Sequence, residues 1–167
     1  WLAAHDPEEV DLYCIGFQEL DNSGWALLLG DTSQSPPWEL AVRSNLPKPE
    51  QCTLVAAQQL VGMLVLLYLR KHEPQSELPS SSASGDNSIA LFGEPSSTPS
   101  HSRPKLNTQM IKRVATSVCA TGFMGVMGNK GATAVRFDLG DTPVCLVNCH
   151  LTPHVGNLAR RNSDFHN

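Results

Sequence analysis

The stretch Phe123–Phe137, which reads FMGVMGNKGATAVRF, is the part of the sequence that says most about the fold. Its first half places three glycines around the pair Asn129 and Lys130, and its second half is a β-rich run. Glycine permits left-handed turns and a close approach of the backbone to a ligand. Asn129 can donate and accept hydrogen bonds, and Lys130 carries a mobile positive charge. The stretch therefore predicts a turn leading into a strand, and that turn is either an ordinary connection or an anion-binding loop.

Apolar runs typical of strands lie on both sides of this turn. We expect strands at Val10–Phe17, Val61–Tyr68, Met110–Ala120, Ala132–Leu139 and Pro143–Leu151. A helix at Val55–Leu67 is the alternative to the second strand, because periodicity does not separate the two. Short helices are expected at Trp38–Leu46 and Asn157–Phe165. The mixture of helices with strands that are apolar on both faces predicts an α/β sandwich whose sheets are covered by helices.

The segment 73–109 has a different composition from the rest of the chain. It is rich in serine and proline and poor in large apolar residues. Such a segment buries too little surface to offset the entropy lost on ordering. Because strand-like runs resume on both sides, we interpret it as a flexible insertion within a single domain that spans the 167 residues.

Composition limits the classes of partner and compartment. The formal net charge of −4 argues against a global attraction to nucleic acid. The longest apolar run, Leu60–Leu69, is too short to span a membrane, and the first residues do not resemble a signal peptide. The cysteines are odd in number and scattered along the sequence, which argues against a disulfide framework and favours a reducing, cytoplasmic compartment. Three of them lie in apolar runs and are expected to be buried: Cys14, Cys145 and Cys149.

Side chains that could bind a metal or take part in catalysis lie at two of the expected strand ends. Glu19 follows the strand Val10–Phe17, where a carboxylate can bind a hard cation such as Mg²⁺ or simply be exposed to solvent. His150 lies at the end of a second strand, with Asn148 on the same face. A histidine in this position can act as an acid, a base or a phosphate donor, and a packed core histidine is an equal alternative.

Two further clusters of side chains suit ligand binding, but each also has a simpler interpretation. Cys145, Cys149, His150 and His154 have zinc-ligand chemistry, but their spacing is unusual for structural zinc. The pair Arg160 and Arg161 suits phosphate oxygens, but adjacent cations on a solvated helix are common, and Asp164 is a candidate partner for either one.

Four ordered motifs resemble the signatures of the inositol polyphosphate 5-phosphatases, and the type II group is the most similar. The motifs are DLYCIGFQELD at 11–21, the stretch 125–137, VNCHL at 147–151 and RRNSDF at 160–165. The resemblance implies the two-sheet α/β sandwich of the endonuclease/exonuclease/phosphatase fold, flanked by helices and truncated here at both ends. It also implies Mg²⁺-dependent hydrolysis of the 5-phosphate of phosphoinositides or soluble inositol polyphosphates.

The resemblance assigns roles to residues that match the motifs. Glu19 would ligate the metal, and His150, supported by Asn148, would act at the scissile phosphate. The substrate-binding residues would be Asn129, Lys130, His154, Arg160 and Arg161. The apolar lip of the loop would face lipid acyl chains, in peripheral contact with a membrane, through Phe123, Met124, Val126 and Met127.

The resemblance also has gaps. The family's opening W-N-x-N strand and its distal G-D-x-N and S-D-H motifs, which supply further catalytic groups, are absent from this sequence, so we expect the chain alone to be inactive. Two alternatives stay open: a catalytically dead phosphoinositide-binding module, and a metal-dependent nuclease of the same fold. A nuclease would need a basic groove, which the acidic composition does not favour.

Overall fold

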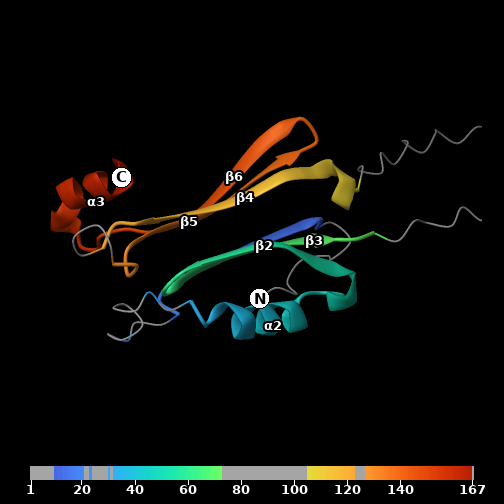
Figure 1. Ribbon diagram of the computed structural model, residues 1–167, viewed down its shortest axis with the longest axis horizontal. Coiled ribbons are helices and arrows are strands. Elements are labelled where there is room, and N and C mark those ends of the chain that lie inside the picture. The colour runs from blue at the N-terminus through green and yellow to red at the C-terminus, as the bar shows by residue number, and fades with distance from the viewer. Residues whose placement is uncertain are drawn as a thin grey trace, which may run out of the picture.

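The computed structural model describes residues 10–20, 23, 30, 32–72, 105–122 and 127–166. Figure 1 shows two antiparallel sheets that face each other, with helix α2 (Ser35–Asn45) on the outer side of one of them. The strand order is β1-β3-β2 in sheet A and β4-β5-β6 in sheet B. The two-sheet sandwich expected from the sequence is therefore confirmed.

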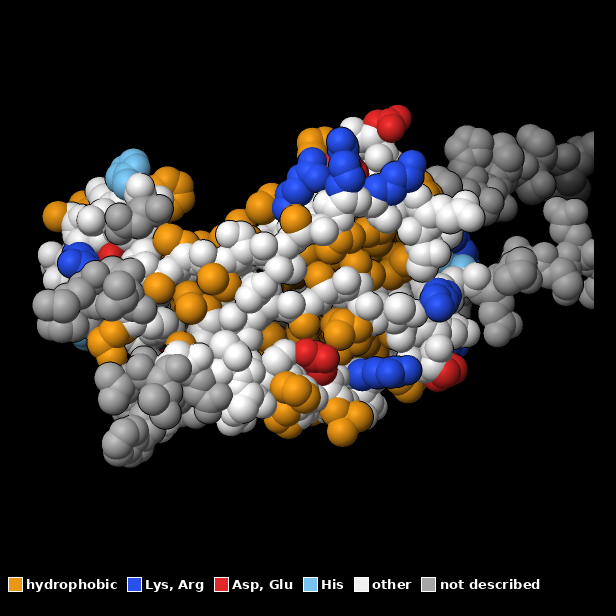
Figure 2. Space-filling view, in the orientation of Figure 1, with side chains coloured by type: hydrophobic (Ala, Val, Ile, Leu, Met, Phe, Trp, Pro, Cys, Tyr) orange, Lys and Arg blue, Asp and Glu red, His pale blue; other side chains and the backbone are white. Residues whose placement is uncertain are grey.

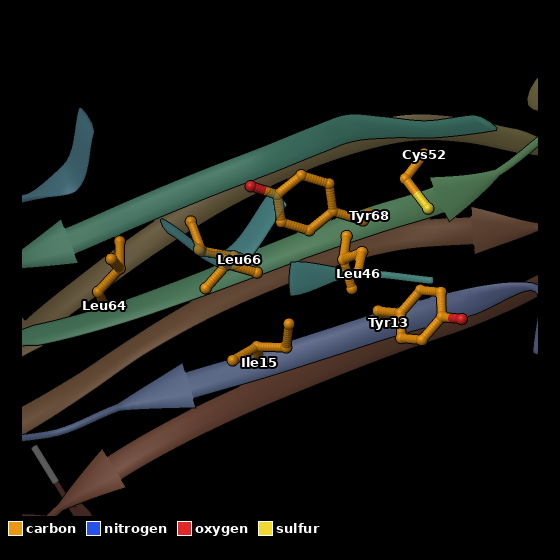
Figure 3. Close-up of a cluster of buried hydrophobic side chains, with 8 residues drawn as sticks. Tyr13, Ile15, Leu46, Cys52, Leu64, Leu66 and Tyr68 are labelled. Carbon is orange, nitrogen blue, oxygen red and sulfur yellow. The ribbon is translucent and has the colours of Figure 1, made fainter. Parts of the chain in front are cut away.

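Sheet A is built around its central strand. Its strands are β1 (Leu12–Phe17), β2 (Cys52–Leu60) and β3 (Met63–Arg70). Every residue of β3 is buried, because one of its faces packs under α2 and the other packs against sheet B. Figure 3 shows the side chains of the first of these clusters, between β1, β3 and the end of α2. A strand covered on both faces reads as a continuous apolar run, which explains the sequence of this region.

The apolar region before residue 70 contains the strand predicted at Val61–Tyr68, as β3, together with a second strand that the sequence did not indicate. The strand expected at Val61–Tyr68 is the second arm of a hairpin, and Val61 and Gly62 form its turn. The alternative helix at Val55–Leu67 is wrong, because both arms are extended and paired from Cys52↔Arg70 to Leu60↔Met63, with one register shift between Leu54 and Ala56. The two apolar runs follow each other so closely that periodicity did not show the turn between them.

Sheet B consists of β4 (Ile111–Ala120), β5 (Gly131–Leu139) and β6 (Thr142–His150). Val135 and Phe137 of β5 complete the core between the sheets. The expectation of a buried strand is wrong for one face of β6. Alternate residues are exposed there, and Val147 has 55% of its surface exposed to solvent. Among the described elements, no helix covers the middle of the outer face of sheet B (Figure 1).

The exposed edge strands also correct the prediction for the cysteines. Cys14, Cys145 and Cys149 are exposed, whereas Cys52 is buried in the core and Cys119 is half-buried. All five thiols are free. Cys145 and Cys149 face outward from β6, and an apolar neighbourhood in sequence did not reveal which face of the strand would be covered.

The two helices begin and end within three residues of the bounds predicted from the sequence. Helix α2 begins at Ser35, three residues before the expected start, because two prolines fit its first turn. A 3₁₀ turn η6 (Val155–Asn157) precedes helix α3 (Leu158–His166). Two further 3₁₀ turns in the described residues are η3 (Pro49–Gln51) and η4 (Thr108–Met110). No helix in the described part of the chain is long and apolar enough to cross a bilayer.

The serine- and proline-rich insertion is described only at its end. Residues 73–104 lie outside the described residues, so the prediction of flexibility there stays a prediction. The last residues assigned to it, from Lys105 to Gln109, are described and lead into η4, whose first turn is capped by the Asn107 side chain. The bounds of the insertion therefore stay a prediction, and its last predicted residues already belong to η4.

Candidate functional site

Three strands end at the same edge of the sandwich and bring the predicted site residues together. Strand β1 leads into Glu19, β5 begins directly after Lys130, and β6 ends at His150. Gly131 pairs with His150 across the β5–β6 ladder, which places Lys130 next to the histidine. Residues more than 100 positions apart in the sequence thus form one cluster, and we call Glu19, Lys130 and His150 the acid–base cluster.

The contacts within the acid–base cluster are short. Lys130 Nζ lies 3.0 Å from His150 Nε2. Glu19 Oε1 lies 3.5 Å from the same nitrogen, a contact that is an ion pair only when the imidazole is protonated. The His150 side chain is 17% exposed, whereas the Glu19 side chain is 60% exposed. The cluster therefore presents a solvent-facing carboxylate above a more deeply placed lysine and histidine.

The surroundings of His150 keep its imidazole neutral. Burial lowers the pKa of His150 below its usual value, and the positive charge of Lys130 lowers it further. The Glu19 carboxylate acts in the opposite direction but is outweighed. A neutral imidazole has one N–H donor and one acceptor nitrogen, and the contact with Lys130 makes Nε2 the acceptor in this arrangement.

Asn148 fastens the two sheets together beside the acid–base cluster. Its amide nitrogen donates to the carbonyl oxygens of Phe17 (2.8 Å) and Leu64 (3.2 Å), which belong to sheet A. Gln18 Nε2 donates to Cys149 O at 2.5 Å and approaches Asn148 Oδ1 at 3.4 Å. Asn148 therefore supports the site by binding the backbone of sheet A. The sequence analysis gave Gln18 no role of its own, although it is adjacent to Glu19.

Glu19 itself has a backbone conformation that non-glycine residues rarely adopt, with φ 60°. Such a conformation costs about 1–3 kcal/mol and persists only where neighbouring contacts hold it. Here the contacts of Gln18 on one side and the hydrogen bond from Leu20 N–H to Gly62 O on the other hold the chain. The left-handed conformation of Glu19 turns the backbone away from the line of β1, at the residue whose carboxylate contacts His150.

Two glycines of the loop between β4 and β5 are required by close packing. A Cβ at position 122 would lie 2.2 Å from Met127 O and 2.1 Å from Asn129 Oδ1. Gly131 has φ 144°, and a Cβ there would lie 2.0 Å from Cys119 O. The loop is therefore a tight, specific structure where it is described. Of its predicted apolar lip, Met127 is half-buried, and Phe123, Met124 and Val126 lie outside the described residues.

Asn129 is placed within this loop with an unusual feature. Its side-chain oxygen Oδ1 is buried and has no hydrogen-bond partner within the described ranges. A buried acceptor without a donor is costly. The substrate-binding role expected for Asn129 stays a prediction.

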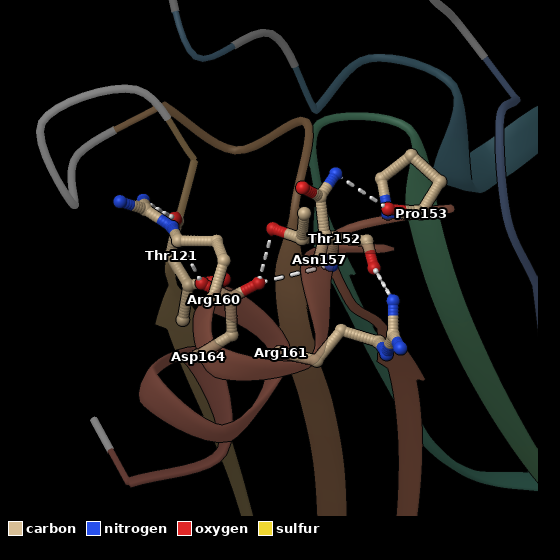
Figure 4. Close-up of polar contacts among 7 residues, drawn as sticks. All are labelled: Thr121, Thr152, Pro153, Asn157, Arg160, Arg161 and Asp164. Atoms are coloured by element: carbon tan, nitrogen blue, oxygen red, sulfur yellow. Dashed lines mark hydrogen bonds and ion pairs between the residues drawn. The ribbon is translucent and has the colours of Figure 1, made fainter. Parts of the chain in front are cut away.

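The two arginines of α3 bind protein groups (Figure 4). Arg160 Nε donates to Asp164 Oδ1 at 3.2 Å, and its Nη2 donates to Thr121 O at 3.2 Å. Arg161 donates to the backbone carbonyls of Thr152, His154 and Val155. Asp164 thus pairs with Arg160, one of the two partners proposed from the sequence. The guanidinium of Arg161 holds the loop after β6, whereas that of Arg160 links α3 to Thr121 at the end of β4.

Asp164 is a buried carboxylate whose partners keep it ionised. Burial alone would raise its pKa, but hydrogen bonds from the hydroxyl and N–H of Thr152 and the charge of Arg160 outweigh burial, so the pKa is lowered. Ionised Asp164 therefore stabilises the fold above the unfolded pKa of about 3.9. This contribution is lost as the pH falls through the still lower pKa of the folded state.

We expect Asp164→Asn to lower the free energy of unfolding at pH 7 by about 1–3 kcal/mol, because buried donors lose a charged acceptor. Urea unfolding of wild type and variant in the full-length protein measures the difference. Below about pH 4 the difference should shrink, because wild-type Asp164 is then itself becoming protonated. A difference that stays constant from pH 7 to pH 3 would contradict the stabilising role of the charge.

The donors in the described part of the chain fit magnesium better than zinc. No group of three or more His, Cys, Asp or Glu side chains within the described ranges is close enough to hold a metal ion. Zinc sites need three or four such ligands, and Cys149 and His150 point to opposite faces of β6, so the zinc interpretation has no structural support. Mg²⁺ commonly binds one or two carboxylates and completes its shell with water and phosphate oxygens, which the exposed Glu19 suits.

Comparison with known proteins shows which proteins the chain is similar to. Residues 104–167 match the family model described as Endonuclease/Exonuclease/phosphatase family 2. The chain is 32% identical over 165 residues to the type II inositol 1,4,5-trisphosphate 5-phosphatase of Mus musculus, covering 99% of this chain and 13% of that protein. It is 28% identical over 172 residues to the inositol-1,4,5-trisphosphate 5-phosphatase 1 of Schizosaccharomyces pombe, covering 99% of this chain and 13% of that protein.

A solved structure agrees with the fold. The inositol polyphosphate 5-phosphatase domain of SPsynaptojanin, in complex with inositol (1,4)-bisphosphate and calcium ion, matches with a TM-score of 0.63 and 26% identity. The match covers 99% of this chain and 38% of the solved chain. The endonuclease/exonuclease/phosphatase-type sandwich expected from the motifs is thereby confirmed, and the chain spans only part of the proteins it resembles.

Proposed function

We propose that this chain, which is homologous to the inositol polyphosphate 5-phosphatases over nearly its whole length, is part of the catalytic domain of an enzyme that hydrolyses the 5-phosphate monoester of inositol polyphosphates or phosphoinositides. The observation that carries the proposal is the convergence of Glu19, Lys130 and His150 at one edge of the sandwich. A carboxylate, an ammonium and an imidazole together suit a phosphate ester and a divalent cation.

Each residue of the acid–base cluster has a distinct task in this proposal. Glu19 holds Mg²⁺, which when bound draws negative charge from the phosphate and aligns it for attack by water. Lys130 has three donors, so it can bind a phosphate oxygen while remaining beside His150. When the Lys130 ammonium turns from Nε2 to the phosphate, Nε2 no longer has to accept, and neutral His150 can donate its N–H from there to an oxygen of the scissile phosphate, where charge increases in the transition state.

The neighbouring loop supports substrate recognition in the same proposal. A hydroxyl group of the inositol ring is a suitable donor for the buried oxygen of Asn129. The engaged guanidinium groups of Arg160 and Arg161 favour a supporting role over direct phosphate binding. We propose peripheral contact with a membrane through the loop that contains Met127, and a cytoplasmic location, which the five free thiols support.

Phosphate release from the full-length protein tests the proposal. Inositol 1,4,5-trisphosphate should release phosphate in the presence of Mg²⁺ and stop doing so when the metal is chelated. Inositol 1,4-bisphosphate, which has no 5-phosphate, is the control and should release none. Equal release from both compounds would contradict 5-phosphatase specificity, and binding of the trisphosphate without any release would favour the non-catalytic phosphoinositide-binding module.

A further inference from the structure

Asp164 is a buried titratable group that the proposed mechanism does not use. Its carboxylate accepts hydrogen bonds from both the backbone N–H (2.9 Å) and the hydroxyl (2.6 Å) of Thr152. Thr152 lies two residues after His150, in the segment that leaves β6. One carboxylate on α3 thus fixes the chain immediately beyond the catalytic histidine (Figure 4).

Arg160 extends this connection to the opposite side of the site. Its guanidinium bridges two groups, because Nε contacts Asp164 and Nη2 contacts the carbonyl oxygen of Thr121. The N–H of the same Thr121 donates to the carbonyl oxygen of Lys130 at 2.9 Å. A continuous series of hydrogen bonds therefore runs from Asp164 through Arg160 and Thr121 to Lys130, whose Nζ meets His150.

We propose that Arg160 and Asp164 are positioning residues, which set the location of Lys130 and His150 relative to each other and so to the phosphate. This inference rests on the proposed function for its effect on catalysis, although the hydrogen-bond series stands without it. Because Asp164 holds the segment after His150 directly and the stem of the Lys130 loop through Arg160, loss of either arm changes the spacing of the two side chains.

The geometry of arginine separates positioning from simple stabilisation. A planar guanidinium can contact Asp164 and Thr121 O at once, whereas a lysine ammonium is a single point charge on a flexible stem. Arg160→Lys should therefore retain the ion pair with Asp164 and lose the contact with Thr121. The variant removes the positioning arm while it leaves the charge that stabilises α3.

We expect Arg160→Lys in the full-length protein to keep a melting temperature close to that of wild type and to lower kcat/KM for inositol 1,4,5-trisphosphate by about 10- to 100-fold, the range for supporting residues that orient a catalytic group. Hydrogen exchange should become faster in peptides that span residues 121–131, because the stem of the loop is released. Exchange in β2 and β3 should not change.

Arg113→Lys is the matched control. Arg113 also pairs with a buried carboxylate, Asp138, but at the other end of the β4–β5 ladder, and Arg136 pairs with the same group. Figure 2 shows that Lys and Arg side chains gather on sheet B at the end away from α3. This variant should leave kcat/KM and exchange at residues 121–131 unchanged.

The outcomes separate the two proposals. If the wild-type protein hydrolyses the trisphosphate but Arg160→Lys leaves both kcat/KM and exchange at residues 121–131 unchanged, the positioning inference is wrong and the proposed function stands. If Arg160→Lys lowers activity only in proportion to a lower melting temperature, its role is stabilising and the inference is also wrong. If the wild-type protein releases no phosphate, the proposed function fails, and exchange alone decides whether the hydrogen-bond series holds the loop.

Discussion

Glu19→Gln should abolish most of the activity of the full-length protein. The amide keeps the size of the carboxylate but loses its negative charge, and Mg²⁺ strongly prefers charged oxygen ligands. We expect kcat/KM for inositol 1,4,5-trisphosphate to fall by about 100-fold or more at low Mg²⁺, by analogy with other losses of metal ligation. Excess Mg²⁺ should recover part of this loss, because the site keeps one neutral oxygen.

The measurement is phosphate release as a function of Mg²⁺ concentration, with direct calorimetric titration of Mg²⁺ as a second readout. Glu50→Gln is the control, because Glu50 is an exposed carboxylate in η3, outside the acid–base cluster. The circular dichroism spectrum should be the same for all three proteins. Near-normal activity of Glu19→Gln at low Mg²⁺ would show that the metal, if used, is held elsewhere.

Glu19→Gln should lower activity more than the loss of an ordinary surface carboxylate, because specific contacts hold the backbone of Glu19 in a strained conformation. Its strained backbone is held between Gln18, which binds the chain beside Asn148, and Leu20, which binds Gly62 O. The side chain nevertheless remains 60% exposed. A strained residue that is supported on both sides and still open to solvent is better explained by a ligand than by packing.

The strands were predictable where hydrophobic pattern and turn residues agree. Leu12–Phe17 and Gly131–Leu139 were located within two residues, because each run is bounded by residues that favour turns. The β2–β3 hairpin was not resolved, because both arms are apolar and its turn contains Val61, a β-branched residue with φ 47°. Propensity does not predict a left-handed valine in a turn, so the hairpin depends on pairing between the two strands.

Burial of the edge strand and the role of the arginines could not be read from the sequence for a different reason. Cys145 and Cys149 lie in an apolar run, but exposure depends on whether another element covers that face of sheet B. Arg160 faces Thr121 O, 39 positions away, and no local pattern encodes that contact. By contrast, Glu19, Lys130 and His150 each lie at a strand end or within two residues of one, and strand ends at one edge of a sandwich are brought together by topology alone.

His150 is the second position where we expect a large loss. His150→Ala removes the N–H that donates to the scissile phosphate and leaves Lys130 without its neighbour at 3.0 Å. We expect kcat to fall by about 100- to 10 000-fold, the range for removal of a positioned donor or proton-transfer group. KM should change less, because the contacts proposed for Lys130 and Asn129 with the inositol phosphate remain.

His150→Gln distinguishes the two kinds of histidine chemistry. A glutamine amide can donate a hydrogen bond but cannot exchange a proton near neutral pH, so it should recover part of kcat if His150 acts as a donor. His166→Ala, at an exposed histidine at the end of α3, is the control and should leave kcat unchanged. If His150→Gln is as inactive as His150→Ala while both remain folded, the donor role is wrong and proton transfer is the better account. Burial and the adjacent ammonium lower the pKa of His150, so the free protein holds a neutral imidazole, which still has an N–H to donate, and the glutamine variant decides between the two roles.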